Sequence, residues 1–284
     1  MGDEAVWRLS IFLGVLVLVA GWEWARPKRA WRESRGLRWG INLGLIGLNV
    51  LIQRLTLGAA AVVMAVHVQN EGWGLLNLVE LPYWFKFVLG LLLLDLAIYL
   101  QHVLSHALPA FWRLHQVHHA DLDLDVTTGL RFHPLEILIS LVYKVAIISA
   151  LGIDPLTVLV FEALLNAASM FSHANLRMSA KVDQIVRWFV ITPDMHRVHH
   201  SIHRDETDSN FGFFLSCWDR LFGTYTAQPR DGHENMVLGL EYYQQQRELS
   251  LKSLLLLPFR ALPLPPTDAL KSKASETCQG KATE

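Results

Sequence analysis

Five stretches of mainly apolar residues dominate this sequence, and each has a length suited to crossing a lipid bilayer. They cover residues 5–22, 40–68, 85–104, 134–151 and 155–172. A helix needs about 20 apolar residues to span the hydrocarbon core. The composition agrees, because 52% of the residues are hydrophobic and only 18% are charged. The sequence therefore predicts an all-α integral membrane bundle of about five membrane helices.

The first apolar stretch has an alternative interpretation as a cleaved signal peptide. Asp3 and Glu4 precede it, where a signal peptide carries basic residues. Trp22-Glu23-Trp24 follows it, where a cleavage site needs small residues. We therefore expect this segment to remain in the protein as a membrane helix.

A dense basic loop between the first two stretches sets the expected orientation. Its cationic residues are Arg26, Lys28, Arg29, Arg32, Arg35 and Arg38. Loops rich in lysine and arginine stay in the cytoplasm. If the helices alternate, the ends of the third and fifth stretches and the C-terminus also face the cytoplasm. The host membrane would be a bacterial inner membrane or the endoplasmic reticulum.

Histidine is unusually frequent for so apolar a chain, with 13 residues, of which eleven lie between His102 and His203. Eight of them form three motifs: His102-x-x-x-His106, His115-x-x-His118-His119 and His196-x-x-His199-His200. Residues three or four apart share one face of a helix. Each motif can therefore direct two or three imidazoles to one point. Eight imidazoles exceed the roughly four to six ligands of one transition metal. The motifs thus predict a site for two metals in a helical cap on the cytoplasmic side.

The residues alone leave the metal and its use open. Imidazole binds zinc, copper, iron and nickel. A hydrolytic zinc site normally uses three protein ligands and an open position. A nitrogen-rich site for two metals is better suited to iron that activates O₂. A metal-dependent membrane hydrolase and a non-catalytic metal-binding membrane protein remain as alternatives.

Several further polar residues are candidates for the site. His173 closes the fifth stretch and is a candidate ninth ligand, whereas His133 and His203 could be ligands or surface residues, and His67 and His233 are expected to play no part. Side chains expected to support the ligands are Asp95, Glu162, Asn166, Asp208 and Asn210. Trp218 is expected to have a structural or gating role. Lys144 and Glu162 should lie at similar depth in adjacent helices, which predicts an ion pair.

Shorter amphipathic segments and a polar tail complete the expected organisation. Residues 72–84 should lie at the membrane interface, and residues 181–192 and 249–262 should form helices on its surface. The predicted units are residues 1–84 with the first membrane helices and the basic loop, 85–226 as the catalytic domain, 227–266 as an amphipathic segment, and 267–284 as a disordered tail.

The order of the three histidine motifs resembles the fatty acid hydroxylase/sterol desaturase superfamily of membrane di-iron enzymes. Residues 131–136, 193–201, 208–212 and 215–225 are also similar to it, and the resemblance runs from about residue 85 to residue 226. Residues 125–131 resemble its alkylglycerol monooxygenase branch.

The resemblance implies an O₂-dependent oxidoreductase that hydroxylates or desaturates a C–H bond of a fatty acid, sterol or alkyl glycerol ether. It carries the eight motif histidines over as ligands of two iron ions, with His173 as a ninth. The sequence has no His-Pro-Gly-Gly haem motif. We therefore expect a separate electron donor, either a cytochrome b5-type or ferredoxin-type protein or a reduced pterin. With a formal net charge of −1, nucleic acid is not an expected partner.

Overall fold

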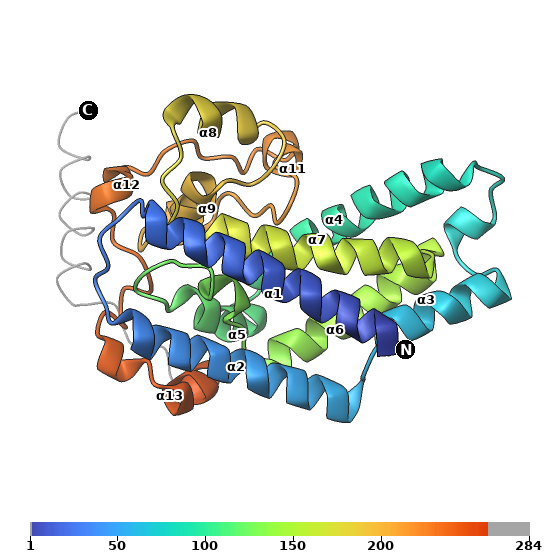
Figure 1. Cartoon of the computed structure of the whole chain (residues 1–284), viewed down its shortest axis with the longest axis horizontal. Coiled ribbons are helices and arrows are strands. Elements are labelled where there is room, and N and C mark those ends of the chain that lie inside the picture. Colours follow the sequence, from blue (N-terminus) through green and yellow to red (C-terminus); the bar gives the residue numbers. More distant parts are fainter. Residues whose placement is uncertain (1, 261–284) are drawn as a thin grey trace, which may run out of the picture.

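The computed structural model of this chain describes residues 2–260, and in that range it is helical, with isolated β-bridges and no strand (Figure 1). This confirms the predicted fold class. The predicted tail 267–284 and the end of the segment 249–262 lie outside the described residues.

Within residues 2–260, four single helices are long and apolar enough to cross a membrane. They are α1 (Gly2–Ala25), α4 (Tyr83–Ala107), α6 (Pro134–Leu151) and α7 (Pro155–His173). A bent pair, α2 (Arg35–Thr56) followed by α3 (Ala60–Glu71), can supply a fifth span. The chain is therefore a multi-pass membrane protein, as its apolar stretches predicted.

The single helix predicted over residues 40–68 is wrong in one respect. The chain leaves the helix at Leu57–Ala59 and turns by 40° before α3 begins. Gly58 has a φ of 53°, a left-handed conformation that glycine adopts without steric cost. The amide groups of Leu57 and Gly58 both donate to the Gln53 carbonyl, which closes the last turn of α2.

The helices run up and down, so that their ends gather at two opposite poles. In Figure 1, α1, α4 and α7 end, and α2 and α6 begin, in the half of the molecule that also contains α5 (Pro109–His119) and α9 (Pro193–His199). The opposite pole holds the α6–α7 turn and the connection from α3 to α4 through the short helix η1 (Leu75–Asn77). All three histidine motifs consequently lie at one pole.

The α6–α7 hairpin is tightly built. Gly152 ends α6 with a φ of 77°, and the Asp154 carboxylate accepts hydrogen bonds from the amides of Leu156 and Thr157 at the start of α7. A Cβ on Gly74 would lie 2.1 Å from the Gly152 nitrogen. The segment 72–84 therefore packs directly on this turn through a glycine contact.

An ion pair joins α6 to α7 as predicted, with Lys144 Nζ 3.3 Å from Glu162 Oε1. Arg8 on α1 also donates to this carboxylate at 2.7 Å, a contact that the sequence did not predict. Burial within a membrane makes such charges costly unless they are paired. Glu162 therefore links three membrane helices.

Removing the shared carboxylate should cost more stability than removing one cation. We expect Glu162→Gln to lower the thermal midpoint in detergent by roughly 5 °C, and Lys144→Gln by less, because only the first change deprives two cations of their common partner. Lys144→Glu combined with Glu162→Lys should recover part of the loss of each single reversal. A double variant no better than the worse single one would show that the Lys144–Glu162 contact contributes nothing.

Two predicted surface helices differ from expectation. α8 (Ala180–Val186) ends well before residue 192, since Val190 forms a β-bridge with Leu215. The segment from residue 249 forms α13 (Leu251–Leu256) and η4 (Leu257–Phe259). Leu249, Leu254 and Leu257 are buried against a cluster from α2 and α5, so this segment belongs to the protein core. Leu256 and Phe259 of the same segment remain exposed.

Candidate metal centre

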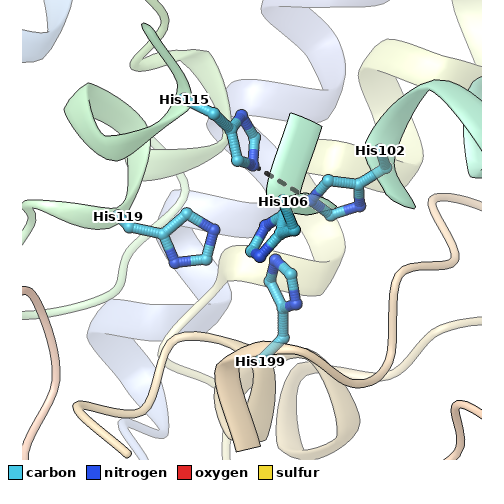
Figure 2. A group of neighbouring side chains, drawn as sticks. All are labelled: His102, His106, His115, His119 and His199. Carbon is cyan, nitrogen blue, oxygen red and sulfur yellow. Dashed lines mark hydrogen bonds between the residues drawn. The ribbon is translucent and has the colours of Figure 1, made fainter. Parts of the chain in front are cut away.

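Nine histidines form two compact groups near the ends of α4, α5, α7 and α9. The first group contains His102, His106, His115, His119 and His199, which Figure 2 shows pointing toward a common centre. The second group contains His118, His173, His196 and His200. Within each group one ring nitrogen of every residue lies within 4.8 Å of the others, and no ring is more than 4% exposed. These are the eight motif histidines and His173.

The helical period explains how three motifs build two groups. On α5, His115 and His119 are one turn apart and face the first group, whereas His118 faces the second. On α9 the pattern is the reverse, because His199 joins the first group and His196 joins the second with His200. α5 and α9 each contribute to both groups, which places the groups side by side.

The ring proton of several histidines is fixed by a backbone carbonyl. The Nδ1 atoms of His102, His199 and His173 lie 2.7 Å from the carbonyl oxygens of Phe211, Ser209 and Ser169, respectively. The Nδ1 atom of His118 lies 3.3 Å from the carbonyl oxygen of Arg131. A carbonyl oxygen only accepts, so each of these Nδ1 atoms must donate. The Nε2 atoms of these rings therefore carry lone pairs.

Carboxylates fix two other rings in the first group. His115 Nδ1 donates to Glu136 Oε1 at 2.6 Å, and His106 Nδ1 donates to Asp208 Oδ1 at 3.1 Å. A carboxylate that accepts from an imidazole orients the ring and makes it a better ligand. Asp208 was predicted to support the ligands, whereas Glu136 was not.

The lone pairs that result face each other and fit a bound cation. His102 Nε2 lies 3.0 Å from His115 Nε2, and His118 Nε2 lies 3.0 Å from His173 Nε2. Since all four protons are on Nδ1, no hydrogen bond can join these pairs. Two ligands at right angles with metal–nitrogen bonds of about 2.1 Å would be about 3.0 Å apart. The Nε2 atoms of His106, His119, His199 and His200 are also buried without a hydrogen-bond partner.

Burial favours the neutral form of five of these imidazoles, which is the form that binds metal. Desolvation, reinforced by the neighbouring imidazoles, lowers the pKa values of five rings outside the membrane helices well below the usual value: His118, His119, His196, His199 and His200. The residues present therefore fit metal ions in both groups.

Other predicted residues lie away from the imidazoles. The Asp95 carboxylate accepts from Trp218 Nε1 at 2.8 Å and from the Leu215 amide at 3.2 Å, so it holds the cap on α4 and does not orient a ring as expected. Glu162 is occupied by Lys144 and Arg8. With Asn166, it lines a cavity of ≈ 60 Å³ between α1 and α7.

Asn210 has a structural role next to α9. It adopts a φ of 52° and donates from its side chain to the carbonyls of Met195 and Thr226. These bonds hold the segment whose Ser209 carbonyl fixes His199. Asn210 therefore supports the ligands through the backbone.

The four remaining histidines lie outside both groups. His133 caps α6 by accepting from the Leu135 amide, and His203 Nε2 lies 2.7 Å from Asp231 at the surface. His67 packs edge-on against Trp73, and His233 lies on the short helix α12 (Gly232–Asn235). His133 and His203, which the sequence left open as ligands, therefore belong to neither histidine group.

Neutralising Glu136 should weaken metal binding in the first group. We expect Glu136→Gln to lower the affinity roughly 10- to 100-fold, because the amide accepts the His115 proton less strongly than the carboxylate does. Competition titration with a chelator measures the change. Glu80→Gln, at an exposed position, is the matched control. Equal affinities for the two variants would contradict this role for Glu136.

Comparison with known proteins agrees with the geometry. Residues 87–224, which contain all nine histidines, match the family model for fatty acid hydroxylases. No solved structure matches.

Three curated relatives are similar to the chain over different lengths. Ornithine lipid hydroxylase OlsE of Rhizobium tropici is 27% identical over 240 residues, which cover 79% of this chain and 69% of the relative. Human alkylglycerol monooxygenase is 29% identical over 175 residues, covering 60% of this chain and 37% of the relative. Rat cholesterol 25-hydroxylase is 27% identical over 142 residues, covering 49% of this chain and 46% of the relative. The chain thus spans less than half the length of the latter two.

The relatives are all lipid-oxidising enzymes by name. The family model matches the region that builds the histidine groups. Residues 87–224 therefore form a fatty acid hydroxylase domain.

Proposed function

We propose that this protein is a membrane-bound di-iron oxygenase that hydroxylates or desaturates a lipid C–H bond with O₂ and an external reductant. The observation that carries the proposal is the pair of buried imidazole groups, with bare Nε2 atoms facing each other at 3.0 Å within each group. Nine nitrogen donors far exceed the three of a hydrolytic zinc site, which argues against the hydrolase alternative.

The five-histidine group would hold one iron and the four-histidine group the other. Bound iron supplies the chemistry that activates O₂ and oxidises an unactivated C–H bond. The chain supplies the position of the ligands. Glu136, Asp208 and the backbone carbonyls accept hydrogen bonds from Nδ1 and so keep the ring proton there. The Nε2 atom of each of these rings is then free to bind metal.

Aromatic side chains enclose the two groups and exclude water. Phe132 stacks on His118 with ring centroids 4.5 Å apart, and Phe213 lies 5.1 Å from His102. Phe213 also packs against the apolar cluster shared by α3, α4, α6 and α7. A lipid chain could therefore approach from the bilayer along these helices, and the polar cap would cover the opposite side.

The proposed orientation puts this centre and the C-terminus on the cytoplasmic side. The basic loop that follows α1 lies at the same pole as the histidines, because Lys28 Nζ pairs with Asp194 on α9 at 2.9 Å. Positive residues favour the cytoplasmic side of a membrane. The electron donor, a cytochrome b5-type or ferredoxin-type protein or a reduced pterin, would act from there.

Lipid analysis tests the proposed reaction. Membranes of cells that express the wild-type protein should contain a hydroxylated or desaturated lipid that is missing from cells expressing His102→Ala at the same level. Supplying fatty acids, sterols and alkyl glycerol ethers in turn identifies the substrate class. Identical lipid profiles in cells that provide iron and a reductant would contradict the proposal.

A further inference from the structure

A network of buried charges lies behind the second histidine group. Arg38 on α2 donates from Nε and Nη2 to the two carboxylate oxygens of Asp121 at 2.7 and 2.9 Å, and from Nη1 to Asp125 at 2.7 Å. All three side chains are completely buried. The guanidinium group also donates to the Asp123 carbonyl at 2.6 Å. The loop after α5 is thereby bound to α2.

Arg131 connects this network to His118. Its side chain is also completely buried, and it donates from Nη1 to Asn42 on α2 at 3.0 Å and from Nε to the Val117 carbonyl at 2.9 Å. Nη1 also lies 3.8 Å from Asp121. The backbone carbonyl of Arg131 is the acceptor that fixes the His118 ring. The side chain and backbone of one residue therefore hold the end of α5 and the imidazole it carries.

The chemistry of the network indicates positioning more than stability. Two arginines and two aspartates balance each other, yet removing four charges from water costs as much as or more than their pairing returns. An apolar cluster could fill the same space at no such cost. A charged network fixes the relative positions of its side chains, because a guanidinium group binds a carboxylate in only a few geometries.

We propose that Arg38, acting through Asp121 and Arg131, is a positioning residue for the four-histidine group. Through Arg38, α2 would help to hold the ligands of this group in place. The inference rests on the proposed metal centre and deepens it. It assigns a role in metal binding to a helix outside residues 87–224.

The proposed effect is confined to one group. Four of the five rings in the five-histidine group have Nδ1 acceptors outside the network, which are Phe211, Ser209, Glu136 and Asp208. In the four-histidine group, His118 depends on Arg131, and His118 Nε2 faces His173 Nε2. Disturbing Arg38 should therefore cost one metal and leave the other.

Arg38→Lys tests this with the charge retained and the fork lost. Metal per chain should fall from about two to about one in protein that is still folded by size exclusion and thermal melting. The matched control is Arg187→Lys, which alters the buried Arg187–Asp183 pair of the cap and should leave about two metals. Asn42→Ala keeps every charge and removes an acceptor of Arg131, so it should also lower the number of metal ions per chain. This variant replaces Arg38→Lys in the test if Arg38→Lys does not fold.

Double variants show which metal is lost. Adding Arg38→Lys to His118→Ala should cause no further loss, whereas adding it to His106→Ala should remove most of the remaining metal. Two metals retained in both Arg38→Lys and Asn42→Ala, or equal loss from both groups, would overturn the inference. A wild-type protein that binds no metal would instead overturn the proposed function.

Discussion

His102→Ala should abolish turnover and lower metal affinity by roughly 100-fold or more, because it deletes a ring at the centre of the five-histidine group. His102 Nε2 faces His115 Nε2, and its ring also lies within 5.1 Å, centroid to centroid, of those of His106 and His199. Metal analysis and product formation on the same preparation measure the two losses. They should occur together.

His67→Ala is the control for this experiment. His67 also belongs to a helix of the bundle, but it packs against Trp73 at the opposite pole and lies outside both groups. Its replacement should leave metal content and turnover at wild-type levels. If the two alanine variants behave alike, the assignment of the ligands is wrong.

Gly129→Ala should be the most damaging single-methyl change near the site. A Cβ at residue 129 would lie 2.6 Å from the carbonyl oxygen of Ser169 on α7, well inside van der Waals contact. That carbonyl accepts from His173 Nδ1, and the Ser169 hydroxyl donates to the Gly129 carbonyl. The new methyl group would push the loop from α7 and disturb His173. We expect a loss of about 2 kcal/mol in stability, or roughly 5 °C in the thermal midpoint, together with metal loss from the four-histidine group.

Gly47→Ala on α2 provides the comparison, since a Cβ there would meet no atom within 4 Å. This variant should be as stable as the wild type or more so, because alanine favours a helix. Thermal melting and metal analysis of both variants measure the difference. A Gly129→Ala protein with the wild-type midpoint and full metal content would show that the contact between Gly129 and Ser169 can relax freely.

The sequence predicted the metal candidates well because their placement is a local property. Imidazoles three and four residues apart share a helix face wherever the helix packs. Their common side followed from counting apolar stretches, and His173 followed from its position at the end of one. All nine therefore come together in the structure. The division into groups of five and four could not be predicted, because it depends on how α5 and α9 cross.

The residues that support the ligands were harder to predict because their contacts are long-range. Glu136 lies 21 positions from His115, and Arg38 lies 83 positions from Asp121. Arg38 has no sequence pattern that separates it from the basic loop, where a solvated charge is the ordinary interpretation. Asp95 shows the opposite error: it shares a face of α4 with His102, but Trp218 and Leu215 of the cap reach it first. The break at Gly58 was also missed, because apolar residues continue on both sides of it.

The most direct test of the account is metal and oxygen analysis of protein purified without air. We predict about two iron ions per chain, with O₂ uptake only when both a lipid substrate and a reductant are added. His102→Ala should show less iron and no such uptake. Iron bound tightly at this stoichiometry without oxygen chemistry under any donor and lipid, or full activity with zinc alone, would contradict the account.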